Sequence, residues 1–94
     1  MMSFISRMTI KPEMEEQFIA CCKKLEEHVH ANEPDTLIYQ FYRLREPNQF
    51  AVVESFTSEE AEEAHQETDY FKTIVPDLVE CLDGEYVREY LDDL

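Results

Sequence analysis

His65 is the residue of this 94-residue chain best suited to acid–base chemistry. In a helix over 58–66 it would share one face with Ala61 and Ala64, so its side chain is expected to point inward. The polar residues around that face are expected to look outward: Glu59, Glu60, Glu62, Glu63, Gln66 and Glu67. Imidazole titrates near neutral pH, so His65 could act as a general base or donate a hydrogen bond to a phenolate or carbonyl. It could equally be a structural histidine that tethers the helix to the sheet through Glu54.

Two other polar side chains are candidates for the same site. Glu54 alternates with Val52 and Phe56, which places it on a largely apolar strand face where an acidic group needs a partner. It could orient His65 and raise the basicity of the imidazole, or it could be structural. The hydroxyl of Tyr70 could enter a cavity as a hydrogen-bond donor, or its ring could belong to the core.

The pattern of apolar residues predicts the elements that would position these side chains. Alternating or β-prone residues predict four strands, at 2–10, 36–44, 50–56 and 85–91. Helical spacing predicts an amphipathic helix from Pro12 to about Asn32, the acidic helix, and a segment over 69–82 that Pro76 kinks or restarts. The resulting β-α-β-β-α-β order is that of a ferredoxin-like α+β fold with a four-stranded antiparallel sheet, in a single domain over 1–94.

Hydroxyl side chains are expected to begin the later helices. Thr57 and Ser58 both offer N-caps for the acidic helix, and Thr57 with Glu60 matches a capping box. Thr68 offers a cap for the segment that follows. Gly84 is expected to end that segment and to release the last strand.

The two middle strands carry apolar or aromatic side chains on both faces. In strand 36–44 we expect one face to hold Leu37, Tyr39 and Phe41, and the other to hold Ile38, Tyr42 and Leu44. Strand 50–56 repeats this, with Phe50, Val52 and Phe56 against Ala51 and Val53. Helices can cover only one face of such a sheet, and a soluble monomer rarely leaves a large apolar face wet. The sequence therefore predicts a homodimer whose two sheets pack face to face.

The charge of the chain excludes two classes of partner. The formal net charge is −14, and the eight Lys and Arg residues are scattered rather than gathered into a patch. Nucleic acids and anionic membranes are approached through basic patches, so neither is an expected partner. No apolar run is long enough to span a bilayer, and the N-terminus lacks the features of a signal peptide. We therefore expect a cytoplasmic protein.

The cysteine and glycine content limits the kinds of site. Cys21, Cys22 and Cys81 form an odd set with an adjacent pair, which is a poor disulfide framework and agrees with a reducing compartment. Neighbouring helical residues point about 100° apart, so the pair cannot share one metal ion. No metal-ligand spacing is present, and the single glycine, Gly84, excludes a glycine-rich phosphate loop.

Taken together, these features resemble the antibiotic biosynthesis monooxygenase (ABM) family, whose members form dimeric α+β barrels. The resemblance covers nearly the whole chain. It rests on the segments Lys11–Phe18, Glu33–Tyr39, Phe50–Phe56 and Glu63–His65, and on Phe71, which falls where the family has Phe or Tyr.

Three positions depart from the pattern of that family. Glu13 stands where the family commonly has Gly, and Phe56 stands where it often has Trp. Tyr70 stands at the position of the family's second histidine, which removes one candidate acid–base group. The chain contains no Trp, and this disfavours the haem-degrading branch, because that branch relies on a helix Trp beside a ligating histidine.

The resemblance implies a cofactor-free oxygenase that acts with O₂ on a phenolic or quinol-type substrate. The candidate catalytic residues of this chain are His65, Tyr70 and Glu54, and the candidate substrate-binding residues are Tyr39, Phe56, Phe71 and Arg43. Two alternatives stay open. One is an isomerase of a small hydroxy-ketone, phosphorylated or not, with Arg7, Arg43 and Arg88 as candidate cationic contacts. The other is a dimeric ligand-binding protein without catalytic activity.

Overall fold

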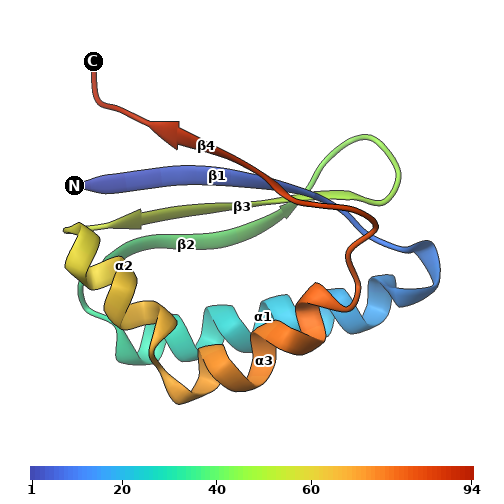
Figure 1. Ribbon diagram of the computed structural model, residues 1–94, viewed down its shortest axis with the longest axis horizontal. Coiled ribbons are helices and arrows are strands. Elements are labelled where there is room, and N and C mark those ends of the chain that lie inside the picture. The colour runs from blue at the N-terminus through green and yellow to red at the C-terminus, as the bar shows by residue number, and fades with distance from the viewer.

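A four-stranded antiparallel sheet with helices on one of its faces makes up the computed structural model, which describes all of residues 1–94 (Figure 1). Its elements are β1 (Met2–Thr9), η1 (Pro12–Met14), α1 (Glu15–Asn32), β2 (Thr36–Arg43), β3 (Gln49–Phe56), α2 (Glu59–Gln66), α3 (Asp69–Val79) and β4 (Val87–Leu91). The strands lie in the order β2-β3-β1-β4. The predicted ferredoxin-like α+β fold is confirmed, with the second helical part divided into α2 and α3. Its pairing with a second copy stays a prediction.

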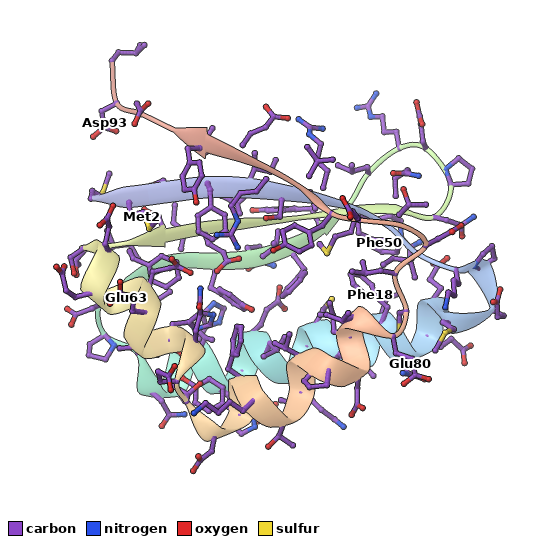
Figure 2. All side chains as sticks on the ribbon, viewed as in Figure 1. Met2, Phe18, Phe50, Glu63, Glu80 and Asp93 are labelled. Carbon is purple, nitrogen blue, oxygen red and sulfur yellow. The ribbon has the colours of Figure 1, made fainter.

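The core forms where α1 and α3 pack on the sheet. Apolar residues three or four apart on α1 are buried, including Phe18, Leu25 and Val29, and so are both Cys21 and Cys22. Phe18 of α1 and Phe50 of β3 point toward one another between the two layers, with ring centroids 4.8 Å apart (Figure 2). None of the helices combines the length and the apolar character needed to cross a membrane.

Strand pairing aligns the polar residues of the inner face, the face toward the helices. Glu54 on β3 lies opposite Tyr39 of β2 and Phe4 of β1. One step along the sheet, Arg88 of β4 lies opposite Ser6 of β1. The register therefore places Glu54 and Arg88 on the same face, on the two strands that flank β1.

Leu37 does not share the buried face of β2 as predicted, because the register shifts between Thr36 and Ile38. Leu37 is the extra residue at this irregularity and has no partner on β3, so its side chain is not held on the face that alternation predicts. Leu37 is 52% exposed, whereas Tyr39, further along the strand, is 4% exposed.

The inner face of α2 also differs from the prediction. His65 is buried as expected, but Ala64 is exposed, and Glu62 is buried rather than turned outward. Glu62 lies three residues before His65, so the buried stripe runs through these two residues. Alanine offers little apolar area to bury, which makes two alanines a weak indication of which side of a short helix faces the core.

Pro76 lies inside α3 without dividing it, so of the two effects predicted for this proline, a kink or a restart of the helix, the restart is wrong. The proline has no N–H to donate to the carbonyl of Lys72, one turn earlier. Both residues are exposed on the helix surface, where water can hydrogen-bond that carbonyl. The helix therefore continues to Val79.

Ser58 and Thr68 are the N-caps of α2 and α3. The Ser58 hydroxyl accepts a hydrogen bond from the Ala61 N–H at 3.1 Å, and the Thr68 hydroxyl accepts one from the Phe71 N–H at 3.3 Å. The capping box predicted for Thr57 is not formed. Its N–H donates to the Asp35 carbonyl at 2.9 Å, so the chain is still extended there and the helix begins one residue later than predicted.

Ser58→Ala is expected to lower the free energy of unfolding by about 1 kcal/mol, because it removes the acceptor for the Ala61 N–H. Urea unfolding of the wild type and the variant would measure the difference. Thr57→Ala is the matched control and should change stability by less than about 0.5 kcal/mol. A larger loss in the control than in Ser58→Ala would contradict the assignment of the cap.

Candidate active site

His65 is held inside a cage of three aromatic rings. Its side chain is 2% exposed. The imidazole centroid lies 5.1 Å from that of Tyr39, 5.4 Å from that of Phe56 and 5.1 Å from that of Phe71. These rings come from β2, β3 and α3, so three elements fix the position of one histidine on α2. A buried imidazole needs polar partners for its two ring nitrogens.

The first partner is Glu33, whose carboxylate oxygens lie 3.0 and 2.9 Å from Nδ1 of His65. Glu33 is the C-cap of α1 and directly precedes Pro34. A residue before proline is driven out of the helical region, and Glu33 has φ −121° and ψ 85°. The proline thus ends the helix at the point where this carboxylate meets His65.

Three hydrogen bonds converge on the Glu33 carboxylate. The Thr36 hydroxyl donates to it at 2.6 Å, and the Tyr70 hydroxyl and the His65 ring N–H are the other donors. Burial acts to raise the pKa of Glu33, but the hydrogen bonds from Thr36, Tyr70 and His65 outweigh it and hold the pKa below its ordinary value. Glu33 is therefore ionised at neutral pH and can only accept. The proton of a neutral His65 accordingly sits on Nδ1, which leaves Nε2 free to accept a proton.

The second partner of the imidazole is Glu54, whose Oε1 lies 3.9 Å from Nε2. Glu54 is 8% exposed. Burial raises its pKa to about 8, with further contributions from the nearby Glu62 and Glu33 carboxylates, while the Arg88 guanidinium acts in the opposite direction. At neutral pH Glu54 is mostly protonated, so it can donate a proton as well as accept one.

A cavity of about 140 Å³ lies beside Glu54, between the inner face of the sheet and α3. Eleven of the fourteen side chains that line it are hydrophobic, among them Tyr39 and Phe71. The other three are Ser6, Glu54 and Arg88. His65 lies behind Glu54 and does not itself line this cavity, so Glu54 is the group that connects the imidazole to it.

The arrangement is suited to moving protons. A ligand in the cavity can exchange a proton with Glu54, and the Glu33 carboxylate stabilises an imidazolium at His65. Nε2 of His65 and Oε1 of Glu54 lie 3.9 Å apart, so they exchange a proton only when this distance shortens. No group of three or more His, Cys, Asp or Glu side chains is arranged to hold a metal ion.

The structure brings most of the predicted site residues together. His65, Glu54, Tyr39, Phe56 and Phe71 meet around the imidazole or the cavity, as the distances above describe. Tyr70 belongs to the same network, but it does so by donating to Glu33 and does not line the cavity.

Arg43 lies elsewhere. It pairs with Glu15 of α1, and its guanidinium lies 5.0 Å from the centroid of the Phe50 ring. It lines a separate groove of about 430 Å³ between α1 and β2. In this structure Arg43 therefore does not contact the cavity beside Glu54.

Sequence reasoning did not identify Glu33 as the partner of His65. It expected Glu54 to tether or orient the imidazole, whereas Glu33 makes the hydrogen bonds to Nδ1. Two local signals were present. Pro34 places Glu33 at a helix end, and Thr36 follows at a spacing that favours a local side-chain hydrogen bond. Neither signal indicates that Glu33 would hydrogen-bond His65, which lies 32 positions later in the chain.

Tyr70→Phe is expected to raise the pKa of Glu33 and to lower the free energy of unfolding by about 1 kcal/mol, since one donor to the carboxylate is lost. The Phe ring would keep the stacking on His28, whose centroid lies 4.9 Å away. An NMR titration of the Glu33 carboxyl carbon, combined with urea unfolding, would measure both effects. The control is Tyr42→Phe, at an exposed position. An equal Glu33 pKa in both variants would show that the Tyr70 hydroxyl has no influence on this carboxylate.

Comparison with known proteins agrees with this fold. The family model described as antibiotic biosynthesis monooxygenase matches residues 1–77. The chain is 32% identical over 86 residues to "Putative monooxygenase YcnE" of Bacillus subtilis (strain 168), covering 89% of this chain and 90% of that protein.

Two solved structures are also similar. One is described as a putative antibiotic biosynthesis monooxygenase from Caulobacter crescentus CB15, with TM-score 0.92, 31% identity and coverage of 99% of this chain and 89% of that one. The other is a conserved protein from Methanosarcina mazei Go1, with TM-score 0.86, 30% identity and coverage of 96% and 89%. The match of the family model over most of the chain, together with these relatives, shows that this protein belongs to the antibiotic biosynthesis monooxygenase (ABM) family.

Proposed function

We propose that this protein is a cofactor-independent monooxygenase that oxidises a small phenol or hydroquinone in the cavity between the sheet and the helices. The observation that carries the proposal is the series Glu33, His65 and Glu54, in which the last two are buried and Glu54 lines a largely apolar cavity. The protein belongs to the ABM family and is similar to a protein named as a putative monooxygenase, and both facts support the same reaction class.

The first step is removal of a proton from a substrate hydroxyl. Protonated Glu54 passes its proton to Nε2 of His65 while its other oxygen takes the hydroxyl proton. The products are a substrate anion and an imidazolium, and the imidazolium is paired with the ionised Glu33. Most of the walls are apolar, which strengthens the charge interactions inside the cavity.

The second step is oxidation of the anion by O₂. A hydroquinone anion is electron-rich and passes one electron to O₂, and recombination of the two radicals forms a carbon–oxygen bond. Loss of water then gives a hydroxyquinone. One oxygen atom enters the product and the other leaves as water with two substrate hydrogens. All four electrons come from the substrate, so the reaction needs no external reductant.

Oxygen uptake by the purified protein with a panel of hydroquinones and polyphenols tests this function. We expect uptake above the uncatalysed rate, one O₂ per substrate, and one ¹⁸O atom in the product when ¹⁸O₂ is supplied. A folded wild-type protein that consumes no O₂ with any member of the panel would contradict the proposal. Substrate conversion without O₂ consumption would favour the isomerase alternative.

A homodimer through the outer face of the sheet is part of this proposal. That face carries apolar side chains from all four strands: Ile5, Ile38, Tyr42, Ala51, Val53, Val87 and Leu91. Ile38 is 48% exposed and Val87 is 58% exposed, so a partner would remove considerable apolar area from water. Sedimentation equilibrium should then give twice the chain mass of 11.2 kDa, and a single-chain mass would contradict the dimer.

We also propose that the protein works in the cytoplasm. Its three cysteines are all free thiols, and all three are buried. Free thiols are typical of a reducing compartment.

A further inference from the structure

We infer that the substrate is a single-ring aromatic carboxylate with a hydroxyl group, and that Arg88 binds its carboxylate. This inference rests on the proposed function for the location of the substrate, and it adds the substrate class. A carboxylate would form an ion pair with the guanidinium that β4 places in the cavity, which a neutral hydroquinone cannot do.

One donor of Arg88, its Nε–H, is buried and has no partner in the protein. Arg88 lies in none of the close contacts between a basic side chain and a carboxyl group. A buried donor without a partner is unfavourable, and it marks a place where a ligand can supply the missing acceptor.

The orientation of Arg88 is fixed by neighbouring rings. Its guanidinium lies 3.9 Å from the centroid of the Phe4 ring and 5.9 Å from that of Tyr86. Stacking on Phe4 occupies one face of the guanidinium plane, whereas its N–H donors lie in the plane, where the neighbouring Tyr90 side chain also interacts with the guanidinium and the Nε–H stays without a partner. N–H donors that lie in one plane can form two parallel hydrogen bonds to the two oxygens of a carboxylate.

The charges around the cavity favour an anion. Of its three polar side chains, Ser6 is neutral and Glu54 is mostly protonated at neutral pH, since burial raises its pKa to about 8. Arg88 therefore supplies the charge of the cavity, although the whole protein carries −14. Glu54 and Arg88 approach from the two strands that flank β1, so a ring between them can direct its hydroxyl to one and its carboxylate to the other.

The size of the cavity limits the ligand to one ring. Its volume of about 140 Å³ is close to the roughly 150 Å³ of a cavity that accommodates benzene. Val79 and Tyr86 line it and are 50% and 51% exposed, so the cavity reaches solvent between the end of α3 and the start of β4. A polar carboxylate next to Arg88 would lie near this opening.

Calorimetric titration with benzoate and 4-hydroxybenzoate, and with their neutral counterparts benzamide and phenol, tests this inference without turnover. We expect the carboxylates to bind the wild type at least tenfold more tightly than the neutral compounds. Arg88→Met should remove that preference and leave the affinity for benzamide and phenol unchanged, whereas Arg88→Lys should retain part of it. Arg7→Met is the control, because Arg7 pairs with Glu89 on the outer face and should not affect binding.

Equal affinities for benzoate and benzamide in the wild type would overturn the inference. So would a preference for benzoate that persists in Arg88→Met with a native circular dichroism spectrum. If Arg88→Met does not fold, loss of part of the preference in Arg88→Lys supports the inference, and full retention overturns it. Binding is measured without O₂, so the carboxylates can bind even if the protein is not an oxygenase. Conversely, oxygen uptake with neutral phenols but no preference for carboxylates would overturn only this inference.

Discussion

His65→Ala is expected to reduce oxygen uptake with a phenolic substrate by roughly 10²–10⁴-fold, the range that general acid–base catalysis contributes. The variant loses the only imidazole beside Glu54, so the proton of the substrate hydroxyl has no base to receive it. Affinity for a ring in the cavity should change less, because His65 lies behind Glu54 and does not line the cavity. Oxygen-electrode kinetics with separate kcat and KM would show the loss in kcat.

His65→Ala is also expected to be less stable than the wild type. Removing a side chain from among three aromatic rings, and one of the donors to Glu33, should lower the free energy of unfolding by on the order of 2–4 kcal/mol. His65→Gln leaves a smaller void and should show the same loss of kcat. His28→Gln removes an exposed imidazole as the matched control and should retain activity. Undiminished uptake by folded His65→Ala would remove the imidazole from the mechanism.

Glu54→Gln is expected to abolish most of the loss of stability that the wild type shows between about pH 5 and 8. The pKa of Glu54 is about 8 in the folded protein, against an ordinary value of 4.5. A carboxyl group with a raised pKa is stabilising in its protonated form, so its contribution is complete below pH 4.5 and is lost as the pH rises through 8. At about 1.4 kcal/mol per unit of pKa, the loss amounts to as much as roughly 5 kcal/mol. That is a large part of the stability of a small domain.

Urea unfolding of the wild type and Glu54→Gln at several values between pH 5 and 9 would measure this effect. The difference between the two proteins isolates Glu54 from the other carboxylates of this acidic chain, which titrate in both. Glu63→Gln is the control, because Glu63 lies on the exposed side of α2 and its substitution should leave the pH dependence unchanged. Parallel stability curves for the wild type and Glu54→Gln would mean that Glu54 is ionised in the folded protein.

Much of the fold was predictable because the spacing of apolar residues within each short segment indicates a helix or a strand. The alternation in β1 places Phe4 and Met8 on the buried face, and the spacing of Phe18, Leu25 and Val29 does the same for α1. These periodicities concern residues a few positions apart, and backbone geometry alone decides which of them share a face. The prediction was weaker for α2: His65 is buried as predicted, but Glu62 is buried beside it while Ala64 is exposed.

By itself, the sequence determined that this is a ferredoxin-like ABM-family chain with an inward His65 and with Glu54 on an apolar strand face. Only the tertiary structure decided that Glu33 hydrogen-bonds that histidine, and that Arg88 reaches the cavity while Arg43 does not. The physical reason is that these contacts join distant parts of the chain. They depend on strand order, on where each helix ends, and on how the layers pack. The spacing of residues within one helix or strand does not determine which distant residues come into contact.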